Sequence, residues 1–162
     1  DSNILRIGST QTATYIAAIR GVVPGADPLP VLIDNTGRLA VGTSSRTVKE
    51  AIADMGRTSE ILMQLRPVTF QYQDRAAAGD QRRQYGLIAE EVAAVAPDLV
   101  AHTADGKIES VFYQHLAPML LNEYQKQQRT IRTQASELAQ QRARVVILEQ
   151  ELQKIKSILG LR

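Results

Sequence analysis

An apolar residue recurs at every seventh position through the C-terminal quarter of the chain, and this repeat constrains the fold most strongly. A heptad with its a and d positions largely filled, kept for about five repeats, is typical of a helix wound around other helices. We therefore expect one long helix over 115–162. Its predicted coiled-coil core is Tyr124, Ile131, Leu138, Val145, Leu148, Leu152, Ile155 and Leu159.

The alternative is a helix that packs on its own domain. It is disfavoured because the apolar stripe is narrow and the other faces carry Gln, Arg, Glu and Lys. Gln127, Gln134 and Gln141 occupy d positions, where polar layers weaken a bundle but restrict its register. The 162 residues include two Phe, five Tyr and no Trp, a small aromatic supply that favours burial shared among several copies.

The first part of the chain, 1–43, alternates short apolar runs with turn residues. We expect strands over 3–8 and 12–21, where Thr and β-branched residues are frequent. A tight hairpin is expected where 31–34 and 38–41 flank Asn35-Thr36-Gly37. Strands this short leave open edges in a monomer, so closure against other chains is expected.

The middle, 44–114, is predicted to be a small α+β unit. Its first expected helix passes through Val48, Ile52 and Met55, and a second helix, capped by Thr58, buries Ile61, Leu62 and Leu65. A strand over 68–72 and a loop over 74–83 are expected to follow. The unit is then expected to continue with a helix through Leu87, Ile88, Val92 and Val95 and to end with a hairpin of 99–102 and 108–113 around Asp105-Gly106.

Ser44 and Lys49 stand where the strand-rich part gives way to the more helical part, and they are a possible nucleophile and base. A lysine amine accepts a proton only when it is uncharged, which burial favours. If a helix begins near Arg46, Lys49 lies in its first turn, whose unpaired amides can stabilise an oxygen that becomes negatively charged during such a reaction. The alternative is that Ser44 or Ser45 caps this helix, with Thr47 and Glu50 forming a capping box.

Other kinds of site find little support. The sequence has no Cys, and His102 and His115 lack zinc-ligand spacing, so neither a metal nor a cofactor is expected. No apolar run is long enough to predict a membrane span. Glu90 and Glu91 diverge on a helix and are expected to be solvated or to form intersubunit salt bridges.

The net charge of +2 does not by itself indicate nucleic acid, but the final helix is basic. Such a helix binds DNA or an acidic surface, or is simply the solvated exterior of a coiled coil, and the last is favoured. Its charged residues are Lys126, Arg129, Arg132, Arg142, Arg144, Lys154, Lys156 and Arg162 against Glu137, Glu149 and Glu151.

Four features in one order resemble the C-terminal intramolecular chaperone auto-processing domain of endosialidase tailspikes and phage tail fibres. They are Ser44-Ser45-Arg46-Thr47-Val48-Lys49, Leu65-Arg66-Pro67-Val68-Thr69-Phe70, Tyr85-Gly86-Leu87-Ile88-Ala89-Glu90-Glu91-Val92 and the terminal heptads. The resemblance covers roughly 44–162. It departs from the family pattern at Ser45, where many members have Asp, and at Thr47-Val48, which replace a basic-plus-apolar pair.

The resemblance implies a homotrimer that folds an upstream β-rich fibre and then cuts itself off with a serine–lysine dyad. Ser44 and Lys49 fall on the dyad, the scissile bond is Thr43–Ser44, and 1–43 is the end of the client stem. It implies a tail fibre or tailspike precursor assembled in the bacterial host cytoplasm, or a prophage-like surface protein, whose partner is its own upstream stem. From the residues themselves, no membrane partner is expected and nucleic acid is disfavoured as a partner. The alternatives are a structural trimerisation cap that never cuts and a DNA-associated trimeric regulator.

Overall fold

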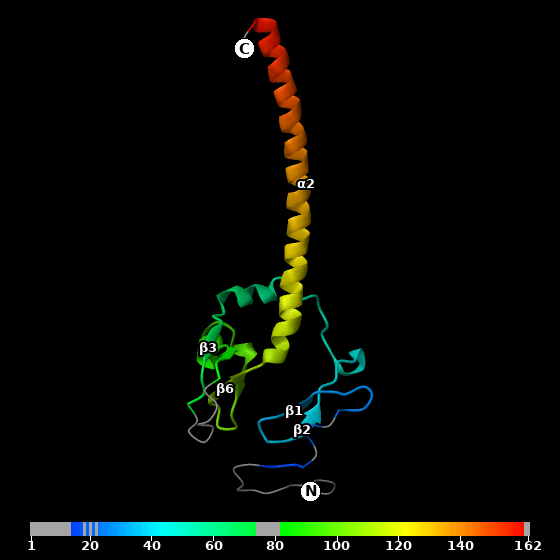
Figure 1. The fold of residues 1–162 in the computed structure, drawn as a ribbon. Helices are drawn as coiled ribbons and strands as arrows, with labels where there is room; N and C mark the ends of the chain where they lie inside the picture. Colours follow the sequence, from blue (N-terminus) through cyan, green and yellow to red (C-terminus); the bar gives the residue numbers. More distant parts are fainter. Residues whose placement is uncertain (1–13, 18, 20, 22, 74–81, 161–162) are drawn as a thin grey trace. The chain divides into compact units, whose positions relative to one another are not determined.

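The structure, a computed structural model, describes residues 14–17, 19, 21, 23–73 and 82–160 (Figure 1). The chain divides into two compact units, 1–48 and 49–162. Its elements are small two-stranded sheets, short helices and one long C-terminal helix. The predicted α+β class is confirmed at this level.

In the first unit, strands β1 (Val31–Ile33) and β2 (Leu39–Val41) form an antiparallel hairpin. Its turn is organised by Asp34, whose Oδ1 accepts hydrogen bonds from the amide of Thr36 at 3.0 Å and the amide of Arg38 at 3.1 Å. The Thr36 hydroxyl donates to the same oxygen at 2.6 Å. The hairpin predicted around Asn35-Thr36-Gly37 is confirmed.

The first unit contains no buried residue among those that the structure describes. Apolar side chains on both strands are exposed, including Val31 and Leu39. The strand predicted over 12–21 is wrong for described residues 14–17, 19 and 21, which form no strand. A strand needs a neighbour for its backbone groups, and no strand in the described part of the chain pairs with these residues. The strand predicted over 3–8 lies outside the described residues.

The helix predicted through Val48, Ile52 and Met55 is also wrong. A three-residue 3-10 turn, η1 (Arg46–Val48), stands at its start, and Ala51 has a φ of 50° that no α-helix accommodates. Val48 and Ile52 are more than half exposed. Their helical spacing is therefore not supported by burial, which is what ordinarily stabilises an amphipathic helix.

In the second unit the helical segments are η2 (Thr58–Gln64), a 3-10 helix, the short α1 (Ala89–Val95) and η4 (Pro97–Leu99). Helical segments predicted around Ile61 and Val92 are present, but they are shorter than expected: Leu65 follows the end of η2, and Leu87 and Ile88 precede α1. Thr58 lies inside η2 instead of capping it, because the cap position is Arg57.

Two hairpins complete the small unit. Strand β3 (Val68–Phe70) pairs antiparallel with β4 (Gln84–Gly86), and β5 (Val100–His102) pairs with β6 (Ile108–Val111). β3 and the second hairpin confirm the sequence prediction, whereas β4 was not predicted. The loop predicted over 74–83 falls mostly on 74–81, outside the described residues.

The core lies where α1, η4, β5, β6 and the start of the long helix meet. Val92 is its most buried apolar side chain, 2% exposed. Ile61, Leu62 and Leu65 of the η2 segment pack around this centre as partly buried residues. The buried apolar residues are Val92, Ala96, Leu99, Val100, Val111 and Met119.

Helix α2 (Tyr113–Leu159) leaves this core and continues far beyond it (Figure 1). Only Met119 is buried along its length, and from Arg129 to Gly160 every residue except Lys156 is exposed. The helix ends at Gly160, whose φ of 63° is the left-handed conformation that glycine adopts at helix C-termini. The single long helix predicted from about His115 is confirmed.

Candidate functional site

The two serines of the Ser44-Ser45 pair have different roles in the structure. Ser45 precedes η1, and its Oγ accepts a hydrogen bond from the amide of Thr47 at 3.3 Å. Its hydroxyl also lies 2.8 Å from the Thr47 hydroxyl. These are the contacts of a helix N-cap. Ser45 therefore makes the capping contacts that the sequence predicted for Ser44 or Ser45.

Ser44 and Lys49 belong to different compact units. Ser44 is in the unit that ends at Val48, and Lys49 is the first residue of the unit that follows. Lys49 comes after η1, so the expectation that it lies in the first turn of a helix is wrong, because the helix does not continue past Val48. Neither unit by itself contains both members of the predicted dyad.

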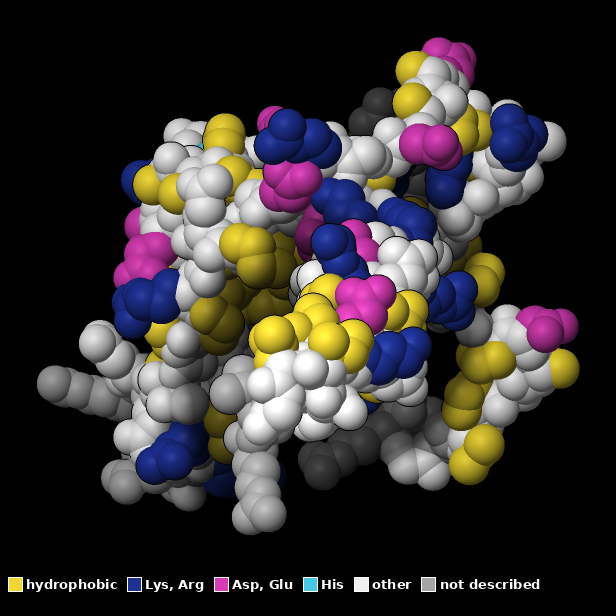
Figure 2. Space-filling view, turned by 90° about the horizontal axis from the view of Figure 1, so that it is seen from above, with side chains coloured by type: hydrophobic (Ala, Val, Ile, Leu, Met, Phe, Trp, Pro, Cys, Tyr) yellow, Lys and Arg dark blue, Asp and Glu magenta, His cyan; other side chains and the backbone are white. Residues whose placement is uncertain are grey.

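The predicted coiled-coil residues form an exposed apolar stripe on α2. All eight of them are between 48% and 63% exposed in the single chain. In a space-filling view, hydrophobic side chains reach the surface in several patches among charged ones (Figure 2). An apolar stripe left half exposed along a helix is typical of a surface that a partner covers.

The first turns of α2 present two different faces. With Tyr124 at position a of the heptad, four residues of α2 that contact the rest of the unit occupy positions c, f and g. They are Met119, Asn122, Glu123 and Lys126. Leu120 falls at d, one heptad before Gln127, and like Tyr124 it is more than half exposed. Apart from Tyr113 at the start of the helix, a d-position residue whose hydroxyl accepts a hydrogen bond from the Leu87 amide, α2 packs on its own unit through residues outside the a and d stripe. From Tyr124 onward, packing within the unit therefore does not account for the heptad repeat.

A polar network centred on the buried Ser59 fastens η2 to α2. Ser59 is completely buried, and its hydroxyl donates to Glu123 Oε1 at 2.5 Å. The side-chain amide of Asn122 donates to Ser59 Oγ at 2.6 Å and to the carbonyl oxygen of Gly56 at 2.9 Å. Lys126 Nζ donates to Glu123 at 2.8 Å and to Glu60 at 3.3 Å. The network joins residues more than sixty positions apart.

The ionisable groups of this network shift one another's pKa values in the direction that favours their charged forms. The hydrogen bond from Lys126, followed by that from Ser59, lowers the pKa of Glu123. The hydrogen bond to Glu123 in turn raises the pKa of Lys126. Arg57, more than Lys126, lowers the pKa of Glu60. The network therefore holds its carboxylates ionised and its amine protonated at neutral pH.

Sequence reasoning missed this network. The only available signal was the spacing of Asn122, Glu123 and Lys126 on one helix, and nothing local pairs them with Ser59. Because Ser59 is fully enclosed, we interpret the cluster as a structural link rather than a substrate site.

Two segments that carried the family resemblance meet in the second unit. Thr69 of β3 lies opposite Tyr85 of β4, and the guanidinium of Arg66 pairs with both carboxylate oxygens of Glu91. The Nε–Oε2 distance is 3.0 Å, and the pair lowers the pKa of Glu91 and raises that of Arg66. The expectation that Glu91 is solvated or pairs between subunits is corrected, because its partner lies in the same chain.

An open apolar groove of about 690 Å³ lies beside the start of α2. Leu65, Val68 and Leu87 form part of its wall, and Leu116 and Leu120 of α2 form another part. Since Leu120 is also a d-position residue, the groove opens next to the beginning of the apolar stripe.

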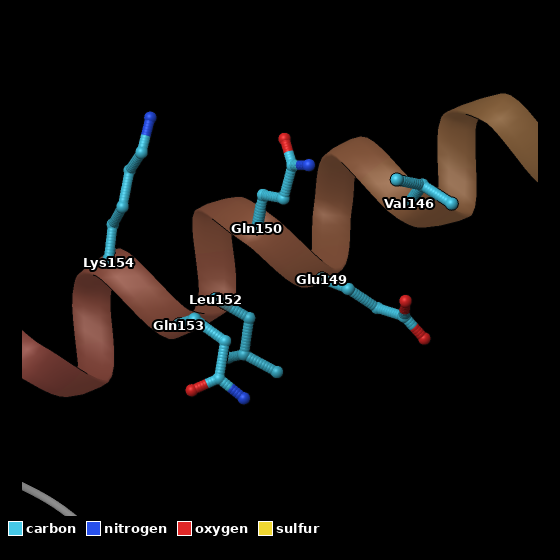
Figure 3. Close-up of a pocket in the computed structure, with 6 residues that line it drawn as sticks. All are labelled: Val146, Glu149, Gln150, Leu152, Gln153 and Lys154. Carbon is cyan, nitrogen blue, oxygen red and sulfur yellow. The ribbon is translucent and has the colours of Figure 1, made fainter.

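A second hollow, near the end of α2, is not a ligand site. Figure 3 shows that its six residues lie along one helix and point to different sides, with Leu152 and Lys154 directed away from each other. Within the described part of the chain, no three metal-ligating side chains gather. Among the same residues, no helix combines the length and hydrophobicity needed to cross a bilayer.

These features define a small α+β module that carries a long helix with an unpartnered heptad stripe. Residues 44–101 match the family model described as chaperone of endosialidase, Peptidase_S74, and this match supports the resemblance of the sequence to the intramolecular chaperone family. The family's name also classes it among peptidases. No curated protein matches the chain.

Proposed function

We propose that the chain is a homotrimeric intramolecular chaperone that folds an upstream β-rich fibre and then releases itself by cutting the Thr43–Ser44 bond. The observation that carries the proposal is that the match to the endosialidase chaperone family begins at Ser44 itself. A domain that starts at the residue following its own scissile bond is what self-release requires. The parent protein would be a phage tailspike or tail fibre.

The chemistry follows from the position of Ser44 directly after the scissile bond. Its Oγ attacks the carbonyl carbon of Thr43 while the uncharged Lys49 amine takes the hydroxyl proton. The carbon–nitrogen bond then breaks, the Ser44 nitrogen takes a proton back from Lys49, and an ester joins Thr43 to the Ser44 oxygen. Water hydrolyses this ester, which leaves a carboxylate on Thr43 and a free hydroxyl and amine on Ser44. Each chain performs the reaction once.

Assembly is supported by the half-exposed heptad stripe of α2. In a bundle, Ile131, Leu138 and their equivalents interlock as knobs in the holes of neighbouring helices. The mixed residues at a and d do not fix the number of helices, so the choice of three copies rests on the family resemblance. The groove beside Leu120 extends the apolar surface available to neighbouring copies.

The client role of 1–43 is supported by the exposed hairpin of the first unit. β1 and β2 expose apolar residues and present unpaired outer edges within the described part of the unit. Such edges pair with further strands when these are offered. A trimeric stem supplies them from its other two copies, and cleavage then makes the folded stem kinetically stable.

The test is mass spectrometry of the freshly expressed wild type beside Ser44→Ala and Lys49→Ala. We expect a fragment that begins at Ser44 in the wild type and in neither variant. Ser45→Ala is the matched control, because it removes the capping hydroxyl next door and leaves both proposed catalytic groups. We expect it to be cut.

The uncut outcome is also informative. A wild type that stays intact in every assembly state would replace self-release with a structural trimerisation cap. Sedimentation separates this from assembly itself, and a stable monomer at micromolar concentration would contradict the trimer. Salt-dependent DNA binding by the basic helix would instead favour a regulator.

A further inference from the structure

The segment from Lys49 to Gly56 has no regular secondary structure, but its far end is fixed. Asn122 of α2 donates to the Gly56 carbonyl at 2.9 Å, and Met55 packs against the core. Ala51, within the segment, has a φ of 50°. A non-glycine residue pays a conformational cost in this region and remains there only when its surroundings hold it.

Asn122 lies next to the beginning of the heptad stripe. It falls at position f, two residues before Tyr124, so it faces the rest of its unit while the a and d residues face away. Its side-chain amide also donates a separate hydrogen bond to the completely buried Ser59 hydroxyl, which in turn donates to Glu123, the next residue of the helix. One short stretch of α2 thus carries both the beginning of the a and d stripe and the residue that anchors the segment from Lys49 to Gly56.

We propose that Asn122 is a positioning residue that transmits the association of α2 helices to Lys49. When the helices pair along a and d, the start of α2 becomes fixed, and the bond to Gly56 then fixes the segment that carries the base. Asn122 touches none of the reacting atoms. The inference rests on the proposed self-cleavage and adds the means by which assembly controls it.

The test compares two side-chain truncations in the polar network around Ser59, both made in the full-length chain. Asn122→Ala removes the bond to Gly56, whereas Ser59→Ala removes the buried hydroxyl but leaves that bond in place. We expect Asn122→Ala to assemble normally and to cut 10- to 100-fold more slowly, the loss that a small displacement of a reacting group produces. Ser59→Ala should cut at close to the wild-type rate. Equal slowing by both variants would indicate a general structural role and overturn the proposal.

A second measurement tests the coupling between helix association and the Lys49 segment without depending on cleavage. In the uncut Ser44→Ala background, hydrogen exchange of the amides of 49–56 is compared between the assembled chain and an unassembled one carrying Leu152→Asp. We expect assembly to protect these amides, and we expect Asn122→Ala to abolish that protection. Gln128→Ala, which truncates another amide on α2, serves as the control and should leave it intact.

The outcomes then distinguish the two hypotheses. A wild type that is never cut, but in which assembly protects 49–56 through Asn122, contradicts the proposed reaction and leaves the coupling in place. Protection that is the same with and without Asn122, or absent throughout, contradicts the coupling whether or not the chain is cut.

Discussion

The hydroxyl oxygen of Tyr113 lies 2.6 Å from the position that a Cβ would occupy on Gly86. This hydroxyl also accepts a hydrogen bond from the Leu87 amide at 2.9 Å, which holds the ring in place. Phe70 closes the other side, with its ring edge 3.1 Å from the same position. Gly86 therefore allows the end of β4 to pack directly against the first residue of α2.

We expect Gly86→Ala to destabilise the second unit by about 1–3 kcal/mol, the usual cost of forcing an extra carbon into a packed site. The measurement is the midpoint of thermal unfolding. Gly25→Ala is the control, because a Cβ there meets nothing within 4 Å. Adding Tyr113→Phe to Gly86→Ala should recover part of the loss. Equal midpoints for the wild type and Gly86→Ala would contradict the steric argument.

This contact illustrates what the sequence could not provide. The hairpin at Asp105-Gly106 was predictable because turn chemistry is local, and Gly106 has the positive φ of 82° that its turn requires. The pairing of β4 with β3 and the bond between Ser59 and Asn122 join distant segments, and no local pattern identifies them.

The helix expected through Ile52 failed for a related reason. Apolar spacing shows which residues would share a helical face, but it does not show whether anything covers that face. The heptad repeat of α2 was more informative, because it continues over many turns with a seven-residue period. For the candidate site, the sequence supplied Ser44 and Lys49, which stay predictions, and the structure added Ser45 as the cap and Asn122 as the anchor.

The apolar stripe predicts how assembly fails. Leu152→Asp places a charge at a position that a coiled coil buries, so we expect it to convert the oligomer into monomers at micromolar concentration. Sedimentation velocity measures this. Gln150→Asp, at the outward f position of the same turn, is the matched control and should assemble. An oligomer that survives Leu152→Asp would show that the helices do not pair along this stripe.

The polar d layers predict a gain in stability. Gln134→Leu replaces one of three glutamines in the stripe, so we expect the oligomer to unfold at a higher temperature because an apolar layer replaces a polar one. We also expect a less uniform oligomeric state, since the polar layer restricts register. Gln140→Leu, outside the a and d positions, is the control. If both substitutions had the same effect on the midpoint, Gln134 would not lie in the seam.

The hairpin turn of the first unit predicts a specific response to acid. Hydrogen bonds from the Thr36 side chain and from the amides of Arg38 and Thr36 lower the pKa of Asp34 from 3.8 to about 2. Because this pKa is lowered by folding, the carboxylate stabilises the turn above about pH 4, and this contribution is lost as the pH falls toward 2. A carbon-detected NMR titration of the Asp34 carboxyl should therefore have its midpoint near 2.

Thr36→Val provides the control for that titration, since it removes the hydroxyl that donates at 2.6 Å and retains the backbone amides. We expect the pKa of Asp34 to move back toward 3.8 in this variant, with the backbone amide signals of position 36 and of Arg38 changing over the same pH interval. Asp34→Asn removes the titrating group, so the same amide signals should become insensitive to pH between 2 and 4. A wild-type midpoint already at 3.8 would mean that the turn is not held by this carboxylate in solution.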